Sequence, residues 1–332
     1  MTTRPSDQMT TLIHLSDLHF GPVLVPHLCE IVLKDIATLN PDAVVISGDF
    51  TLRARHREYE AAREFLHRIN KPTLTIPCNH DQPLFNPIER LTRPCARYCQ
   101  YVHSLSANNA NSANLSLRGA VLSERSESKD ATKQPPTREL EIPFAYAQGK
   151  ASQTPLAMTI REDSRDSRMT DSTLAAGDLF IVGLNDNRPI LPGGFWSRAQ
   201  RAWLEQQLAS APRGAVKVVV THHQLLWEGK WRPAGFWYPS RALELLARHG
   251  VALVLNGHTH TSSIAQTREG IVVARAGTAT SSRMRHGSGN SYNLITIDEK
   301  QISVFVRCYD AQADAFVAGR AVAFRRSFRH AT

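Results

Sequence analysis

The chain has 332 residues, of which 42% are hydrophobic and 21% charged, and its formal net charge is +9. This composition is ordinary for a globular protein, and the length allows one large domain with a substantial core. Its apolar runs fall short of the roughly 20 residues that cross a bilayer, and its start lacks the apolar stretch of a signal peptide. We therefore expect a cytoplasmic protein that makes no membrane contact.

Cysteine content and charge limit the classes of partner. The five cysteines are odd in number and scattered, which excludes a disulfide scaffold. The positive charge permits nucleic acid as a partner, but arginine is spread along the chain rather than blocked, so nucleic acid is not favoured. The sequence does not define the oligomeric state.

The first part of the chain alternates short apolar runs with amphipathic segments. Because strands alternate with helices at this spacing, the pattern predicts βαβ units and a largely parallel sheet. The predicted strands are 12–17, 43–49 and 72–76, and the predicted helices are 23–39 and 56–69.

Residues 106–176 have a different composition. Runs such as SANNANSANLS and SERSESKD contain few aromatic or large apolar residues. Such a segment buries too little apolar surface to offset the entropy lost on ordering. We predict a mostly disordered insertion that carries none of the chemistry and interrupts a single domain at 9–330; a regulatory lid is the alternative.

The α/β pattern resumes after the insertion, with predicted strands at 179–184, 216–221 and 251–255 and helices at 197–208 and 240–249. Ser197 is a suitable N-cap for the first of these helices. Beyond residue 257, period-two segments at 270–276, 292–298, 302–309 and 321–328 predict a second, mixed or antiparallel sheet.

Five polar clusters directly follow predicted apolar strands. Ligand sites in open α/β sheets gather outside the carboxyl ends of the strands, so we expect these clusters to meet. They are Asp17-Leu18-His19, Gly48-Asp49, Asn79-His80-Asp81, Thr221-His222-His223 and Asn256-Gly257-His258-Thr259-His260.

The side chains of these clusters have the chemistry of metal ligands. Carboxylates, imidazoles and an amide oxygen suit Mn²⁺, Fe²⁺/Fe³⁺ or Zn²⁺. They exceed what one ion takes, which favours two ions sharing a bridging carboxylate. Such a centre activates water for in-line attack of a bridging hydroxide on phosphorus. Taken singly, each cluster could instead be a helix cap or a turn.

The ordered set D-x-H, G-D, N-H-D, H and G-H-x-H resembles the calcineurin-like metallophosphoesterase superfamily. The stretches LIHLSDLHFG, VVISGDFT, IPCNHDQPLFNP and VVVTHH are similar to its bacterial cyclic-nucleotide phosphodiesterase-like group. This resemblance covers the chain outside the insertion. It implies an α/β fold, a four-layer α-β-β-α sandwich of two mixed sheets flanked by helices, with a dinuclear metal centre.

The resemblance also implies a role for each site residue. The implied metal ligands are Asp17, His19 and His260 for the first ion, Asp49 for both ions, and Asn79, His222 and His258 for the second. His80 would stabilise charge on the phosphate or protonate the leaving oxygen, and Asp81 would orient His80. The alternative for Asp81 is a cap for the following segment, and the two roles are compatible. His223 would support the site or contact substrate.

One position departs from the family pattern, which has glycine where this chain has Cys78. Glycine there can serve an unusual backbone angle or a close approach to the site. Cys78 could therefore weaken metal binding, displace His80 or itself ligate a metal, and simple steric tolerance is the other interpretation.

We therefore expect a metal-dependent phosphodiesterase acting on small phosphodiesters, with 3′,5′-cyclic nucleotides as the first candidates. The alternatives are a nuclease of the same superfamily that acts on DNA, and a weakly active or decayed homologue with a binding role. Candidate substrate contacts are the aromatic segment 227–238 and the basic residues Arg283, Arg285 and His286. The aromatic segment is equally consistent with an oligomer contact or a cover over the core.

Overall fold

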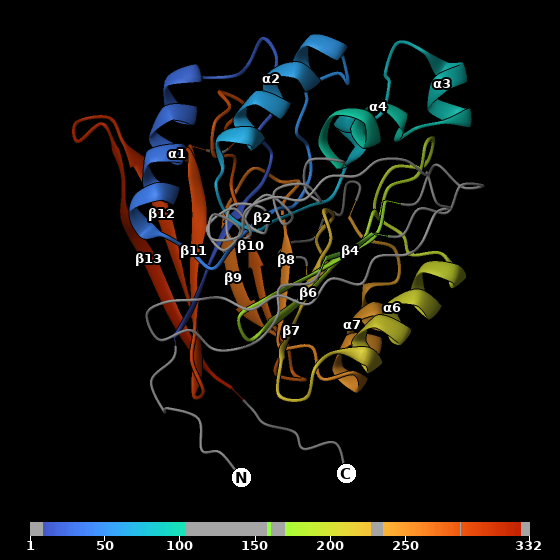
Figure 1. Ribbon diagram of the computed structural model, residues 1–332, viewed down its shortest axis with the longest axis vertical. Coiled ribbons are helices and arrows are strands. Elements are labelled where there is room, and N and C mark those ends of the chain that lie inside the picture. The colour runs from blue at the N-terminus through green and yellow to red at the C-terminus, as the bar shows by residue number, and fades with distance from the viewer. Residues whose placement is uncertain (1–8, 104–157, 161–169, 227–234, 286, 327–332) are drawn as a thin grey trace, which may run out of the picture.

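Two mixed sheets lie face to face, with helices on the outer side of each (Figure 1). The computed structural model describes residues 9–103, 158–160, 170–226, 235–285 and 287–326. Within these ranges, none of the helices is long and apolar enough to cross a membrane.

The first sheet has the strand order β13-β12-β11-β1-β2-β3. Strands β1, β2 and β3 are parallel, and β11 joins the other edge of β1 in the antiparallel direction. The strands are β1 (Thr10–Leu15), β2 (Ala43–Ile46), β3 (Thr73–Thr75), β11 (Ser291–Ile297), β12 (Gln301–Asp310) and β13 (Ala315–Arg325).

The second sheet has the order β4-β5-β6-β7-β8-β10-β9. Its centre, from β6 to β10, is parallel, and both edges are antiparallel. The strands are β4 (Met158–Ile160), β5 (Ser172–Ala176), β6 (Leu179–Gly183), β7 (Val216–Val220), β8 (Leu253–Asn256), β9 (Ser263–Gln266) and β10 (Val272–Arg275).

Helices cover the outer faces of both sheets. Ser197 begins α6 as predicted, because its Oγ accepts a hydrogen bond from the Gln200 amide at 3.1 Å. The helices are α1 (Pro26–Leu39), α2 (His56–Arg68), α3 (Pro87–Thr92), α4 (Ala96–Tyr98), α6 (Arg198–Ser210) and α7 (Pro239–Arg248), with a 3-10 turn η1 (Asn79–Asp81) and a π-helical turn η2 (Cys99–His103).

Three apolar cores separate these layers. Successive residues of β1 point to opposite faces, so Ile13 packs against α1 and α2 while Leu12 packs against the second sheet. On the far face of the second sheet, Val182 and Val219 pack against α6 and α7. The order helix, sheet, sheet, helix confirms the predicted four-layer α-β-β-α sandwich.

The structure contradicts the predicted sheet membership of three C-terminal segments, 292–298, 302–309 and 321–328. β10 pairs in parallel with β8, whereas β11 to β13 extend the first sheet, so the period-two strands do not form a sheet of their own. β13 begins at Ala315 rather than at 321. Period-two alternation identifies a strand but carries no information about which neighbour it pairs with.

The predicted insertion ends earlier than the sequence indicates. Ser172–Ala176 form β5, all of whose residues are buried, and β5 pairs with β6 and with β4. These residues belong to the second sheet. Most of 106–176, namely 106–157 and 161–169, lies outside the described residues.

We expect Gly183→Ala to destabilise the protein, because Gly183 of β6 packs closely against the first sheet. An added Cβ would lie 2.7 Å from Cγ2 of Ile76 and 2.8 Å from Cδ2 of Leu74. Overpacking of this kind costs about 1–3 kcal/mol, measurable by urea unfolding. Gly289→Ala is the control, since nothing lies within 4 Å of its added Cβ; equal losses in both variants would contradict the close packing.

Candidate metal centre

The predicted polar clusters meet at the carboxyl ends of strands from both sheets. Asp17 and His19 follow β1, Asp49 follows β2, and Asn79 begins η1 after β3. His222 follows β7, and His258 and His260 follow β8. The structure therefore brings to one place segments that are far apart in the sequence.

The centre of this group is a compact set of buried side chains, Asp17, His19, Asp49 and His260. Each offers one ligand atom, and these atoms lie within 4.8 Å of one another. Nε2 of His260 is 3.3 Å from Oδ1 of Asp17, and Nε2 of His19 is 3.8 Å from Oδ2 of Asp49. None of the four is more than 2% exposed.

His222 also approaches both carboxylates, with Nε2 3.9 Å from Oδ1 of Asp17. Its Nε2 is 3.7 Å from Oδ2 of Asp49, the same oxygen that His19 approaches. The ring of His258 packs against His222, with centroids 5.2 Å apart. His258 and Asn79 line the same neighbouring cavity. Imidazoles from two different strand ends thus approach one oxygen of Asp49, which allows this carboxylate to serve two ions.

Three imidazoles are held in the same way by main-chain carbonyls. Because each Nδ1–H donates to a carbonyl, each Nε2 presents a lone pair to the centre. The contacts are His19 Nδ1 to Thr51 O (3.3 Å), His222 Nδ1 to Ser47 O (2.6 Å) and His260 Nδ1 to Arg283 O (2.5 Å). Nε2 of His19 and Nε2 of His260 are 3.0 Å apart, a contact that needs a proton or a cation between them.

The buried polar atoms of this centre fit a bound cation. Oδ1 of Asp17 and Nε2 of His222 are buried without a hydrogen bond, which is costly unless another group compensates them. Burial lowers the pKa of His19 to about 4 and lowers the pKa of His258 well below its usual value. Both rings are therefore neutral at neutral pH, as metal ligands must be.

The two carboxylates are ionised. Burial opposes the charge on Asp17, but the close imidazole of His260, with Nε2 3.3 Å from Oδ1, and the nearby His222 and His19 hold the pKa of Asp17 well below its usual range. The pKa of Asp49 is lowered in the same direction, against burial, by His222 and its neighbours. Two buried anions surrounded by imidazole side chains form a candidate site for divalent cations.

Backbone strain is concentrated in the same residues. Left-handed backbone costs a non-glycine residue about 1–2 kcal/mol, and such positions cluster at functional sites. The predicted ligands with positive φ are Asp17 (53°), His19 (52°), Asp49 (53°), His258 (75°) and His260 (58°). In D-x-H and in H-x-H, alternate residues share this conformation.

His80 lies beside the first group of ligands, with its ring centroid 5.0 Å from that of His19. Its Nδ1 donates to the Leu52 carbonyl at 2.7 Å, and its Nε2 is 3.2 Å from Nη1 of Arg283. As seated, the ring is a neutral tautomer that accepts a hydrogen bond from Arg283.

Asp81 does not contact the His80 ring, contrary to the prediction that Asp81 orients it. Its carboxylate accepts hydrogen bonds from the amides of Phe50, Thr51 and Cys78 at 3.2, 2.9 and 2.9 Å. Asp81 therefore caps η1 and ties it to the loop after β2. It positions His80 only through the main chain.

Cys78 fits the site without backbone strain. Its φ is −136° and its ψ −170°, an extended conformation that any residue adopts. Sγ donates to Oδ1 of Asn79 at 3.0 Å, and burial raises the pKa of the thiol well above its usual value. Sγ also lies in a second set of possible ligand atoms, with Asp49 and His222, that are all within 4.8 Å of one another, so the structure allows both steric tolerance and ligation by Cys78.

Asp186 is a residue of this site that sequence reasoning missed. Its carboxylate accepts from Nδ1 of His223 at 3.1 Å, from the His223 amide at 2.9 Å and from Oγ1 of Thr221 at 2.6 Å. His223 is thus held by Asp186 rather than directed at Asp49. Asp186 follows β6, so its position just beyond an apolar strand was the available signal.

The other predicted substrate contacts are only partly described. Arg283 reaches His80, whereas Arg285 is exposed at the surface. His286 and residues 227–234 of the aromatic segment lie outside the described residues. Trp237 of that segment donates from Nε1 to the Pro192 carbonyl at 3.1 Å.

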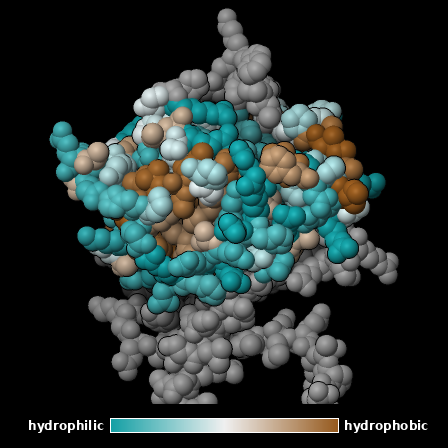
Figure 2. Space-filling model, turned by 90° about the horizontal axis from the view of Figure 1, so that it is seen from above, coloured by the Kyte–Doolittle hydropathy of each residue, from teal (hydrophilic) through white to brown (hydrophobic). Residues whose placement is uncertain are grey.

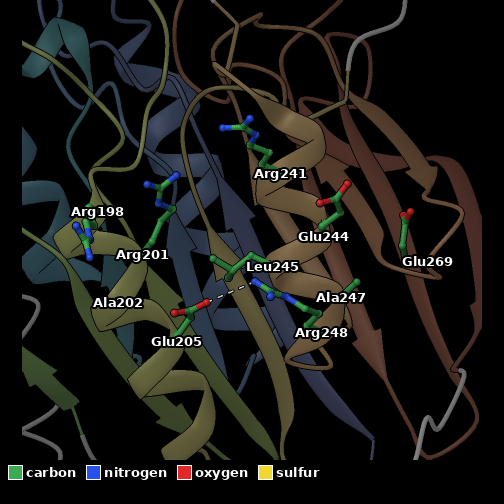
Figure 3. Close-up of a pocket in the computed structure, with 10 residues that line it drawn as sticks. All are labelled: Arg198, Arg201, Ala202, Glu205, Arg241, Glu244, Leu245, Ala247, Arg248 and Glu269. Atoms are coloured by element: carbon green, nitrogen blue, oxygen red, sulfur yellow. Dashed lines mark ion pairs between the residues drawn. The ribbon is translucent and has the colours of Figure 1, made fainter.

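A larger cavity lies between α6 and α7, away from these ligands (Figure 3). It measures about 730 Å³ and is lined by residues of both charges. Arg248 and Glu205 form an ion pair across it, with Nη2 and Oε1 3.6 Å apart. It contains none of the predicted metal ligands.

Comparisons with solved structures agree with this fold. A dimetal phosphatase from Danio rerio is 11% identical, with a TM-score of 0.55, over 96% of this chain and 99% of that one. A purple acid phosphatase from yellow lupin (Lupinus luteus) is 11% identical, with a TM-score of 0.58, over 98% of this chain and 55% of that one. At such identities the likeness concerns the fold alone.

Two curated sequences are similar to part of the chain. A probable cyclic nucleotide phosphodiesterase of Synechococcus is 31% identical over 101 residues, 27% of this chain and 37% of the relative. The glycerophosphodiester phosphodiesterase GpdQ of Enterobacter lignolyticus is 39% identical over 80 residues, 21% of this chain and 29% of the relative. The chain thus spans about a third of the length of these relatives.

The model of one protein family matches most of the chain. This family is the calcineurin-like phosphoesterases, and the match runs over residues 10–262, from β1 to just beyond the G-H-T-H cluster. It therefore includes every strand end that supplies a ligand to the centre. The chain belongs to the calcineurin-like phosphoesterase family and is a metallophosphoesterase.

Proposed function

We propose that this metallophosphoesterase is a phosphodiesterase that acts on small phosphodiesters, with 3′,5′-cyclic nucleotides as the first candidates. One observation carries the proposal: Oδ2 of the buried Asp49 carboxylate is 3.8 Å from Nε2 of His19 and 3.7 Å from Nε2 of His222, so one carboxylate can serve two ions. Both matched curated relatives are named as phosphodiesterases, which supports a diester as substrate.

The residues of the centre fit two metal ions, in agreement with a family that depends on dinuclear metal sites. We assign Asp17, His19 and His260 to the first ion, Asp49 to both, and Asn79, His222 and His258 to the second. Mn²⁺, Fe²⁺/Fe³⁺ and Zn²⁺ all suit such ligands. When bound, the ions supply an activated water and electrostatic stabilisation for attack on phosphorus.

His80 and Arg283 act on the side of the first ligand group. The Arg283 guanidinium, held 3.2 Å from Nε2 of His80, brings positive charge to where phosphate oxygens would lie. When Arg283 turns to a phosphate oxygen, His80 is released from that hydrogen bond. His80 can then donate to the leaving oxygen, but only as an imidazolium, because Nδ1 already donates to Leu52.

We expect Asp49→Ala to remove hydrolysis and bound metal together, because one carboxylate serves both ions. Hydrolysis of bis(p-nitrophenyl) phosphate should fall by on the order of 10²-fold or more. Metal content, measured by mass spectrometry of the digested protein, should fall from about two ions per chain. Asp42→Ala is the control, since Asp42 is exposed at the opposite end of β2; an Asp49→Ala protein that keeps its metal would refute the bridging role.

Gly48→Ala should damage the second ligand group specifically. Gly48 has φ +98°, and an added Cβ would lie 2.7 Å from Nδ1 of His222 and 2.8 Å from Cβ of Cys78. The clash pushes His222 off the Ser47 carbonyl, so metal content and turnover should drop together. Gly289→Ala controls for the substitution itself, and unchanged metal content in Gly48→Ala would remove His222 from the ligand set.

Cys78→Gly should leave hydrolysis without a large change, because Cys78 has ordinary extended backbone and relieves no strain when replaced. The measurement is kcat/KM on bis(p-nitrophenyl) phosphate with matched metal loading. A silent parent whose activity appears only in Cys78→Gly would identify a decayed enzyme.

Cleavage of single-stranded DNA that falls steeply with salt would instead favour the nuclease alternative.

A further inference from the structure

We propose that the cavity beside Asn79 and His258 binds the second, non-leaving ester group of the phosphodiester, and that this group is aromatic or otherwise apolar. This inference rests on the proposed phosphodiesterase function and narrows its substrate class. The cavity measures about 260 Å³, and Asn79, His223 and His258 are among the residues that line it.

The position of the cavity favours a phosphodiester over a phosphomonoester as the substrate. His80 and Arg283 lie on the side of the first ligand group, next to His19. The cavity lies on the side of the second group, where His258 and His222 pack together. A phosphate centred on the metals would place its leaving group toward His80. Only a diester has a second ester group that can occupy the cavity beside the second ligand group.

One wall of the cavity is an apolar loop that is fixed in place at both ends. Nε of Arg90 donates to the Pro189 carbonyl at 2.6 Å, and Nε1 of Trp237 donates to the Pro192 carbonyl at 3.1 Å. Between these anchors, Ile190 and Leu191 are 76% and 52% exposed. The loop therefore holds two large apolar side chains in solvent at the edge of the site.

Hydrophobic residues are exposed on the face of the molecule that Figure 2 draws. Figure 2, which looks down on Figure 1 from above α2 to α4, shows brown hydrophobic areas among teal residues. Contiguous exposed apolar surface on a folded protein marks a binding site. Ile190 and Leu191 line the same cavity as the proposed metal ligands Asn79 and His258. The simplest occupant of such a cavity is part of the substrate.

The charge of the cavity matches the phosphate that this group is attached to. Arg90 and Arg188 both line it. Arg90 donates from Nε to Pro189 O and from Nη1 to Gln82 O at 3.3 Å, both neutral carbonyls that do not cancel its charge. A site with cationic walls and an apolar rim suits a phosphodiester whose retained group is apolar.

The test compares three substrates that share one leaving group and differ only in the second ester. These are p-nitrophenyl phenyl phosphate, methyl p-nitrophenyl phosphate and p-nitrophenyl phosphate, which has no second ester. The parent should prefer the phenyl diester to the methyl diester. The double variant Ile190→Ser with Leu191→Ser should lose about tenfold in kcat/KM on the phenyl diester, through KM, and little on the other two.

Ile88→Ser is the matched control, because Ile88 is 73% exposed on α3 but does not line the cavity. It should leave all three rates unchanged. Equal losses on the three substrates in the double variant, or a parent that does not distinguish phenyl from methyl, would overturn the inference.

A binding measurement separates this inference from the proposed function. Calorimetry of the purified protein with diphenyl phosphate and dimethyl phosphate, which lack a good leaving group, needs no turnover. The parent should bind diphenyl phosphate more tightly, and the double variant should lose that preference. If hydrolysis is absent but the preference is present, the phosphodiesterase proposal fails and the cavity stands. If hydrolysis is present without the preference, the cavity proposal fails.

Discussion

The structure depends on two buried carboxylates, Asp17 and Asp49, which are 0% and 1% exposed. Placing like charges out of water is unfavourable unless other groups compensate them. Around these two, the chain supplies imidazoles whose other nitrogens are tied to main-chain carbonyls, and main-chain amides such as that of His258, 3.0 Å from Oδ2 of Asp17. These contacts compensate only part of the charge, and Oδ1 of Asp17 faces the centre without a hydrogen bond. The remaining, uncompensated negative charge favours the binding of cations at this site.

The architecture keeps those carboxylates in place through a second buried network. His14 of β1 contacts Oγ of Ser47 at 2.8 Å and Nδ2 of Asn293 at 3.3 Å, so one imidazole connects β2 and β11 to the strand between them. Burial lowers the pKa of His14 to about 3, and a neutral ring adds no charge beneath the site. The strained backbone at the strand ends is stable because rigid neighbouring strands determine its course on both sides.

Much of this could be predicted from the sequence because buried strands are apolar runs, and a polar residue directly after such a run must lie at a sheet edge. That reasoning correctly placed Asp17, Asp49 and His258 together, at the carboxyl ends of their strands. It failed where pairing rather than pattern decides the structure. The small residues of β5 are buried only because β6 lies beside them, and neither the partner of β10 nor that of β11 is encoded in local periodicity.

Single residues outside motifs were equally difficult to identify. Asp186 stands in a loop with no repeated spacing, and its role appears only when His223 is brought to it from another strand. Asp81 follows His80 in the chain, but the 3-10 turn directs its carboxylate to the amides of a different loop. Sequence proximity indicates contact only when the local backbone conformation is known.

The distance along the chain between site residues has a consequence for biosynthesis. His19 and His260, whose Nε2 atoms are 3.0 Å apart, are separated by 241 residues. β1 also needs β11 as its antiparallel neighbour, so the loop that carries Asp17 lacks part of its support until late in translation. Such long-range pairing is slow to form, and metal sites are rarely preformed in unfolded chains. A site that uses both His19 and His260 is therefore complete only after the C-terminal half of the chain has been made and has folded onto β1.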